Sequence, residues 1–297
     1  MRGLLFFLWL SVAHAQTIPE ILSRVSEEAE VFRHNAKQML SEETLTQRAV
    51  KAQPRFHPRI GAAAMKPPVQ QWQTREIRSE YSFGALKDAP ESLHEFREIT
   101  AVDGREVSTV QRARHSLSLG ISSADDHARK RMLENFQKQG LATAVVDFGP
   151  LLLLFTKRQI DNYHFEAAGS ERIGADQVQV IVYRQTAGPN RMLIFQGRQA
   201  LKEPIQGKIY ARVPDGLPLR ITMTERREQS RHTYKDEATV DYVMNSHGFL
   251  APAAVTHRGF FDDELVVEDN FRYTPFRKFG ADAAIQFKLE DEPEKKQ

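Results

Sequence analysis

The clearest pattern in the sequence is an alternation of apolar and polar residues between positions 205 and 224. Nearly every second position is apolar or glycine, which is typical of a strand that buries one face. The apolar set consists of Ile205, Ile209, Ala211 and Val213, followed by Leu217, Leu219, Ile221 and Met223. Pro214, Asp215 and Gly216 separate the two runs with residues that favour turns. The segment therefore predicts an antiparallel hairpin with one buried and one solvated face.

The same two-residue period continues on both sides of this hairpin. Toward the C-terminus it predicts strands through Val240 and Tyr242, through Val255 and over residues 265–273, with turns at 246–248 and 262–263. Toward the N-terminus it begins near Thr74, and Asp103-Gly104 is a dipeptide that closes two-residue hairpins. These segments predict a mainly β (α+β) fold built on a long antiparallel meander.

Helical periodicity appears in three places. Residues 16–50 predict an amphipathic N-terminal helix that starts with Thr17 and Glu20 as a capping box. Its apolar stripe consists of Ile18, Ile21, Leu22, Val25, Phe32, Met39 and Leu40. A second helix is predicted over residues 125–138. A third, from Pro150 to about Arg158, has apolar side chains on all sides, so we expect it to be buried, with Leu153 inside and Thr156 exposed.

The segments between these elements indicate how the chain is organised. Residues 51–73 lose all periodicity and contain several prolines, which predicts a surface linker. The region that follows, residues 74–289, is predicted to be one β domain with a helical insertion at about 120–160. Residues 290–297 are charged and are predicted to form a disordered tail.

Residues 1–15 match a secretory signal peptide. Arg2 supplies the positive region, Leu4 to Val12 the apolar region and Ala13-His14-Ala15 the small-x-small cleavage pattern. A nine-residue apolar helix rises only about 14 Å, whereas a bilayer core is roughly 30 Å thick, so a membrane anchor is disfavoured. We therefore expect cleavage after Ala15 and a periplasmic location, with no stable membrane span.

Composition excludes several classes of function. The sequence has no cysteine, which rules out disulfides, thiolate metal sites and a cysteine nucleophile. Removal of residues 1–15 would take away one of the 41 basic residues, against 39 acidic ones, so the mature chain is nearly neutral. Basic and acidic residues are interleaved along the chain. No nucleic-acid partner is therefore predicted.

Short chemical motifs have simple structural explanations. Asp147-Phe148-Gly149 matches the magnesium-binding triplet of protein kinases, but the other kinase motifs are absent, so a strand end followed by a turn is the better interpretation. His94 and Glu98 are interpreted as a surface pair, on a segment that could equally begin a strand. The acidic run 262–264 is interpreted as solvated turn residues. No catalytic residues, metal site or cofactor are predicted, and the protein is not expected to be an enzyme.

Three segments resemble the C-terminal strands of the LolA-like superfamily of outer-membrane lipoprotein-sorting proteins: GKIYARVPDGLPLRITM, TVDYVMNSHGFLAPAAVTHRGFF and FRYTPFRKFGADAAIQF. The resemblance covers about residues 160–289. It implies a strongly curved, open antiparallel sheet, a half-barrel, packed against the N-terminal helix and the inserted helices. In carriers of this family an apolar cavity between sheet and helices holds lipid acyl chains, and no reaction is catalysed.

Three functions are compatible with these patterns. The leading hypothesis is a periplasmic, non-enzymatic carrier or binding protein for an apolar ligand, such as a lipid or a lipoprotein acyl chain. Its cavity is predicted to be lined by Leu151, Leu152, Leu154, Phe155, Phe32, Leu219 and Ile221. The alternative is an envelope scaffold with a filled core that binds a protein partner through the linker or a sheet edge. A secreted hydrolase is the third and weakest hypothesis, because dispersed acid pairs leave no linear motif.

Overall fold

A computed structural model gives the fold of residues 16–51, 70–87, 89–123, 126–141, 147–187, 192–196, 199–229 and 231–279. The predicted signal peptide 1–15, residues 52–69 of the predicted linker and the tail 290–297 lie outside these residues.

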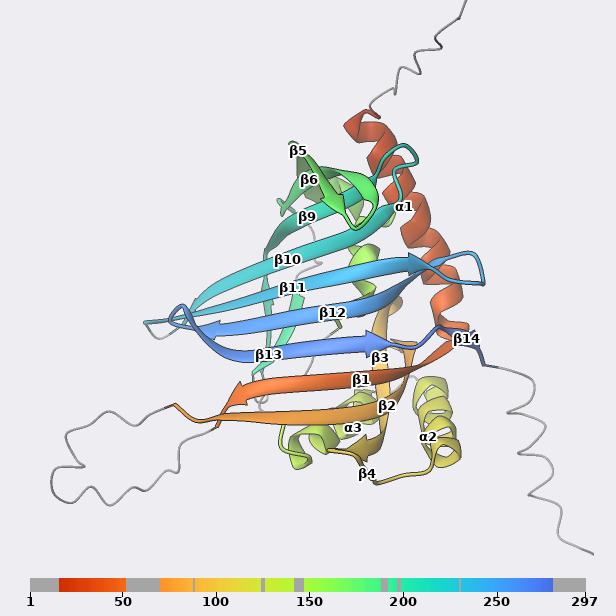
Figure 1. The fold of residues 1–297 in the computed structure, drawn as a ribbon, viewed down its shortest axis with the longest axis vertical. Coiled ribbons are helices and arrows are strands. Elements are labelled where there is room, and N and C mark those ends of the chain that lie inside the picture. The colour runs from red at the N-terminus through yellow and green to blue at the C-terminus, as the bar shows by residue number, and fades with distance from the viewer. Residues whose placement is uncertain are drawn as a thin grey trace, which may run out of the picture.

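Most of the described chain belongs to one antiparallel sheet (Figure 1). Eleven of its twelve strands follow the order β4-β3-β2-β1-β13-β12-β11-β10-β9-β6-β5, and the twelfth, β14, pairs with the start of β1. The strands before residue 110 are β1 Met39–Val50, β2 Trp72–Leu86, β3 Ala89–Val102 and β4 Arg105–Glu106. The later ones are β5 Tyr163–Ile173, β6 Asp176–Gln185, β9 Ile205–Arg212, β10 Pro218–Gln229, β11 His232–Met244, β12 Leu250–Phe261, β13 Glu264–Tyr273 and β14 Arg277–Lys278. A separate hairpin contains β7 Met192–Gln196 and β8 Gln199–Glu203.

Helices occur mainly at the N-terminus and between β4 and β5. The α-helices are α1 Ile18–Asn35, α2 Val110–Ser123 and α3 Asp126–Lys138, and the 3-10 helices are η1 Ala36–Gln38, η3 Gly149–Phe155 and η4 Ile160–Asn162. The curved, unclosed sheet with an N-terminal helix and a few others confirms the predicted fold class. The predicted helix over residues 150–158 is a shorter 3-10 helix, and α2 was not predicted.

The predicted hairpins and turns are also confirmed. Asp103 and Gly104 close β3 and β4 with φ angles of 48° and 77°, and Asp262 and Asp263 close β12 and β13 with φ angles of 48° and 63°. Positive φ at both central positions matches the right-handed twist of the flanking strands. The acidic run 262–264 therefore belongs to a tight turn, as predicted.

The N-terminal helix is shorter than predicted, because residues 39–50 form strand β1. This strand pairs with β2 on one side and with β13 on the other. It thereby joins the meander of β2 to β4 to the meander of β5 to β13. Met39 and Leu40 continue the helical stripe of α1, but Thr44, Thr46 and Val50 are β-branched and favour a strand. Pairing on both sides, with the next strand β2 and with the distant β13, outweighs the local periodicity.

Helix α1 and the 3-10 helix η3 cover one face of the sheet, which we call the inner face. Figure 1 shows α1 running from the β5 and β6 end of the sheet to the end of β1 and β14. The Phe32 ring on α1 lies 5.2 Å from the Phe83 ring on β2 and 6.3 Å from the Phe249 ring, measured between centroids. Inward-facing residues such as Leu45 and Ile221 belong to the same buried cluster. The sheet and α1 therefore share one core.

Helix α2 covers the opposite, outer face at β2 and β3. A small second cluster forms there from Leu40, Leu86, Phe96 and Leu117. Within α2 only Ala113 and Leu117 are buried, which explains why the sequence did not predict this helix: its apolar stripe is too narrow. Helix α3 contacts both α2 and β3, and its buried residues Met132 and Phe136 belong to the inner core cluster.

The inner core yields a prediction about η3. Leu152 has 0% exposed surface, whereas Leu119 on α2 is 57% exposed. Replacing Leu152 by Ala should lower the free energy of unfolding by about 2–5 kcal/mol, because it leaves a cavity that neighbours cannot fill. The matched change Leu119→Ala should cost less than about 0.5 kcal/mol. Urea unfolding of both variants measures this, and equal midpoints would show that η3 is not part of the core.

Candidate functional site

The triplet Asp147-Phe148-Gly149 lies at the centre of a buried polar network. Asp147 Oδ2 accepts a hydrogen bond from Arg129 Nη2 at 2.6 Å and lies 2.7 Å from His94 Nδ1, and its Oδ1 accepts from Glu95 N at 2.8 Å. Burial alone would raise the pKa of Asp147, but Arg129 and His94 outweigh it and lower the pKa to about 2. The carboxylate is therefore ionised at neutral pH and anchors this segment.

This network corrects the interpretation of His94 and Glu98 as a surface pair. His94 is buried on β3 and contacts Asp147 and Arg129, whereas Glu98 accepts a hydrogen bond from Ser116. The two side chains share a strand face but have different partners. The other interpretation of this segment, a strand, is confirmed.

Arg97 forms the second half of the network, with two buried carboxylates. Its Nε donates to both oxygens of Glu43, at 2.8 and 3.0 Å, and its Nη2 donates to Glu95 Oε2 at 2.8 Å. The other oxygen of Glu95 accepts from Tyr81 Oη at 2.7 Å and from Gly149 N at 2.9 Å. Burial raises the pKa of Glu95, and the charge of Arg97 opposes that shift. Each of these polar groups is held by another, which indicates a structural rather than an acid–base role.

Gly149 is required by the close approach of this network. A Cβ atom at this position would lie 2.6 Å from Glu95 Oε1 and 2.8 Å from Tyr81 Oη. On its other side, Tyr242 Oη donates to Gly149 O at 2.9 Å and accepts from Leu152 N at 3.0 Å. These bonds fix residues 147–155, which we call the plug, against the inner face.

Phe148 connects the plug to a buried histidine. Its ring stacks on the His257 ring with centroids 4.6 Å apart and an interplanar angle of 24°. His257 lies between two carboxylates, with Nδ1 2.9 Å from Asp269 and Nε2 2.9 Å from Asp236. Burial would lower the pKa of His257, but the hydrogen bonds and charges of Asp236 and Asp269 outweigh it and raise the pKa to about 9.

The seven predicted lining residues are brought together, but as parts of the packed inner core. Five of them are at most 5% exposed: Leu151, Leu152, Phe155, Phe32 and Ile221. Leu154 and Leu219 are partly buried against the same cluster. None of the seven lines the pocket described next, and their contact with a ligand stays a prediction. Thr156, predicted to be exposed, is buried, while Leu153 is only partly buried.

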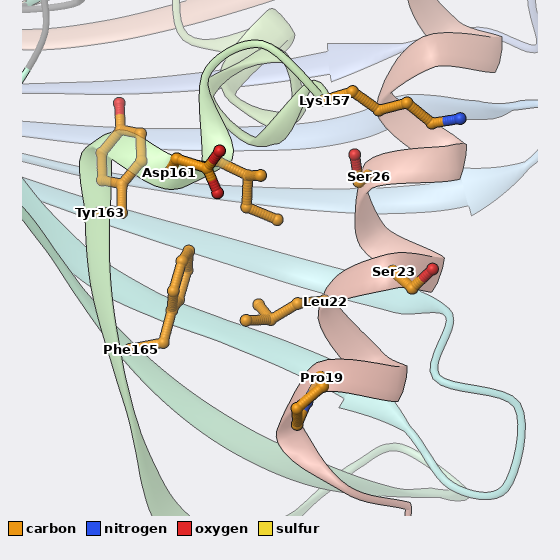
Figure 2. A pocket seen from close by; sticks show the side chains of 9 residues that line it. Pro19, Leu22, Ser23, Ser26, Lys157, Asp161, Tyr163 and Phe165 are labelled. Atoms are coloured by element: carbon orange, nitrogen blue, oxygen red, sulfur yellow. The ribbon is translucent and has the colours of Figure 1, made fainter.

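A pocket of about 500 Å³ opens at the rim of the sheet, between α1, residues 157–161 and the edge strand β5 (Figure 2). We call it the rim pocket. Its lining consists of Pro19, Leu22, Ser23, Ser26, Lys157, Ile160, Asp161, Tyr163 and Phe165. Figure 2 shows Leu22 on α1 pointing across the gap toward Phe165 on β5. The Phe155 ring of the plug lies behind this wall, 5.5 Å from the Tyr163 ring and 6.0 Å from the Phe165 ring.

Two buried hydroxyl groups belong to residues that line this pocket. The side-chain oxygens of Ser26 and Tyr163 are buried and have no hydrogen-bond partner among the described residues. Burial raises the pKa of Tyr163, so its hydroxyl stays protonated and can donate. Leaving a buried hydroxyl without a partner costs about 1–3 kcal/mol. Neither hydroxyl was predicted from the sequence, although Ser26 lies one helical turn after Leu22.

Two other features are absent from the described part of the chain. Its helices are each too short or too polar to span a bilayer. No group of three or more His, Asp or Glu side chains there has the arrangement of a metal site.

Comparison with known proteins gives similarity at the level of structure only. No protein-family model matches the sequence, and no curated protein is significantly similar to it. Among solved structures, an outer membrane lipoprotein-sorting protein domain from Vibrio parahaemolyticus is 11% identical, with 90% of this chain and 97% of that chain covered and a TM-score of 0.36. A DUF1329 family protein from Desulfovibrio piger is 9% identical, with 88% and 94% covered and a TM-score of 0.36.

A third structure, MucB in complex with MucA(peri), is 8% identical, with 86% and 99% covered and a TM-score of 0.18. The first match is named as a lipoprotein-sorting protein domain, the group of proteins whose C-terminal strands the three sequence segments resemble. At these TM-scores the chains do not superpose closely, so these matches carry no argument about the function of this chain.

The buried histidine leads to a prediction about pH. Because the folded-state pKa of His257 is about 9 and the unfolded value is about 6.5, its contribution is fully present below pH 6.5 and is lost as the pH rises through 9. The shift corresponds to about 3 kcal/mol. Urea unfolding between pH 6 and pH 10 should show this loss in wild type and a weaker pH dependence in His257→Gln.

The control is His232→Gln, because His232 also lies 2.7 Å from an aspartate, Asp262, but is exposed. This variant should keep the wild-type pH dependence. If His257→Gln kept it as well, the loss of stability at high pH would have to come from another group.

Proposed function

We propose that this protein is a non-enzymatic binding or carrier protein of the periplasm, and that it holds an apolar ligand in the rim pocket. The observation that carries the proposal is the pocket itself, a gap between α1 and β5 whose lining combines apolar side chains with Lys157, Asp161 and residues that carry two unpaired buried hydroxyls. The location in the periplasm rests on the signal pattern of residues 1–15.

The chemistry of the lining favours an acyl chain that carries an acceptor oxygen. Leu22, Ile160 and Phe165 provide apolar surface, and each Å² of apolar surface that a ligand buries contributes about 25 cal/mol. The hydroxyls of Ser26 and Tyr163 are suited to donate to a carboxyl or ester oxygen. The volume of about 500 Å³ lies within the range of roughly 300–1,000 Å³ that is usual for small-molecule sites.

The rim is a more suitable place for this ligand than the interior beneath the sheet. The plug occupies the inner face and is fixed at Asp147, Gly149 and Leu152 by hydrogen bonds. A ligand in the interior would have to displace Leu152 and Phe155, which have no exposed surface. A ligand at the rim displaces only water. We therefore propose that the predicted interior lining residues support the pocket from behind.

The packed inner face also favours a second candidate, an envelope scaffold that binds a protein partner. Strand β5 is the last strand of the sheet and one candidate docking edge. Its pairing with β6 shifts register between Ala167 and Ser170, and Gly169 has a φ of 95°. Bulges of this kind protect an edge strand from pairing with another chain. The rim pocket is therefore the stronger candidate.

The test is fluorescence titration with the fatty acid cis-parinaric acid. Wild type should bind it saturably, and Leu22→Trp should weaken binding about tenfold or more, because the indole fills the gap. Val31→Trp is the matched control, since Val31 lies on the same helix, is 38% exposed and does not line the pocket. It should bind like wild type.

Two further variants test the hydroxyls separately. Ser26→Ala and Tyr163→Phe should each weaken binding by about fivefold, the value of one neutral hydrogen bond. Neither should lower the free energy of unfolding of the free protein by more than about 1 kcal/mol, because each removes an unpaired polar group. Absence of saturable binding in wild type, or equal affinities for Leu22→Trp and Val31→Trp, would exclude the rim pocket as the ligand site.

A further inference from the structure

A second pocket lies on the outer face of the sheet, away from the rim. It has a volume of about 580 Å³ and lies between α2, α3 and β3. We call it the outer pocket. Phe96, Leu117 and Met132 are lining residues that are buried, and Leu119 is a lining residue that is 57% exposed. An apolar interior with an exposed leucine beside it offers surface to an apolar group of a ligand.

A half-buried carboxylate belongs to the same lining. Glu98 Oε1 accepts a hydrogen bond from Ser116 Oγ at 2.8 Å. Glu98 forms no ion pair with any residue in the described part of the chain. Burial raises the pKa of Glu98, while the bond from Ser116 and the charge of Arg131 oppose that shift. Charged groups removed from water are usually paired, so the Glu98 carboxylate is a candidate partner for a cation.

Other carboxylates of β2 and β3 are paired differently. Glu80 on the same outer side lies 3.1 Å from Arg114 Nε, and Glu95 on the inner side is bound by Arg97. Glu98 thus differs from its neighbours in having a hydroxyl partner and an adjoining cavity, while Arg131 acts on it through its charge without forming an ion pair.

We propose that the outer pocket binds a small organic ammonium ion with a short apolar tail. The ammonium group would donate to Glu98, and the tail would lie against Phe96, Leu117 and Leu119. The proposal assigns recognition to the Glu98 carboxylate, so this ligand differs in class from the one proposed for the rim pocket. The two pockets share no lining residue.

Two arginines also line the outer pocket: Arg97, which is paired with Glu43 and Glu95, and Arg131, which is the alternative source of positive charge. Arg131 is exposed on α3, and no hydrogen bond or ion pair joins it to Glu98 in the described residues. If a ligand cation takes the place next to Glu98, Arg131 opposes its binding through like-charge repulsion. If instead the pocket accepts an anion, Arg131 is the group that holds it. The two possibilities predict opposite effects of removing this side chain.

The experiment is isothermal titration calorimetry with n-octylammonium chloride, and with sodium n-octanoate as the anionic comparison. Wild type should bind n-octylammonium saturably. Glu98→Gln keeps the shape of the side chain and should weaken this binding about tenfold, because it removes a charge-assisted hydrogen bond. Leu119→Ser should weaken it severalfold. Arg131→Gln should strengthen it, and Leu22→Trp in the rim pocket should leave it unchanged.

Three results would overturn the proposal: no saturable n-octylammonium binding by wild type, equal affinity of wild type and Glu98→Gln, or loss of binding in Arg131→Gln. Thermal melts of each variant establish that it is folded. Leu119→Ser keeps the test decisive if Glu98→Gln is unstable, because Leu119 is exposed and its replacement should not disturb the fold. Glu98→Gln should still bind cis-parinaric acid, because that ligand is assigned to the rim pocket. Failure of one site can therefore be distinguished from failure of the other.

Discussion

The interaction on which the rest of the structure depends is the buried pairing of Arg97 with Glu43 and Glu95. It joins β1 to β3, and through Glu95 it reaches Tyr81 on β2 and the backbone of Gly149. The Arg97 guanidinium also lies 5.0 Å from the centre of the Tyr81 ring and 5.4 Å from that of Phe271 on β13. Loss of one partner from such a set leaves a buried charge, which typically costs about 3–5 kcal/mol. The set therefore specifies one arrangement of the strands and the plug.

The position of the plug determines where a ligand can be accommodated. An open curved sheet has an inner face that must be covered, and here the chain covers it with α1 and with residues 147–155. The plug is fixed by polar bonds at its start and by apolar packing at Leu152 and Phe155. The space that remains lies at the borders of this core. One such space is the rim pocket beside β5, and another is the outer pocket beneath α2 and α3.

Much of the sheet was predictable because its strands alternate strictly and its turns contain Asp and Gly. Strand β1 was not, because Met39 and Leu40 fit the helical stripe of α1 and one of its two partners, β13, lies far away in the sequence. The ionic network was not predictable either. A binary pattern places charged residues on the solvent side of a strand, whereas Glu43, Glu95 and Arg97 face inward. One signal was available: Glu43 lies two residues before Leu45 and hence on the same face. The rim pocket depends on the approach of α1 to β5, which local sequence does not encode.

The central claim is that a ligand contacts the rim of the sheet and not its filled interior. The most direct measurement is a set of isotope-filtered nuclear Overhauser effects between an unlabelled acyl ligand and the protein with labelled leucine, isoleucine and phenylalanine side chains. We expect contacts from the acyl chain to the methyl groups of Leu22 and the ring of Phe165, and none to Leu152 or Ile221. Contacts to Leu152 and Ile221 would contradict this claim, because they would show that the plug moves aside and that the ligand enters the interior.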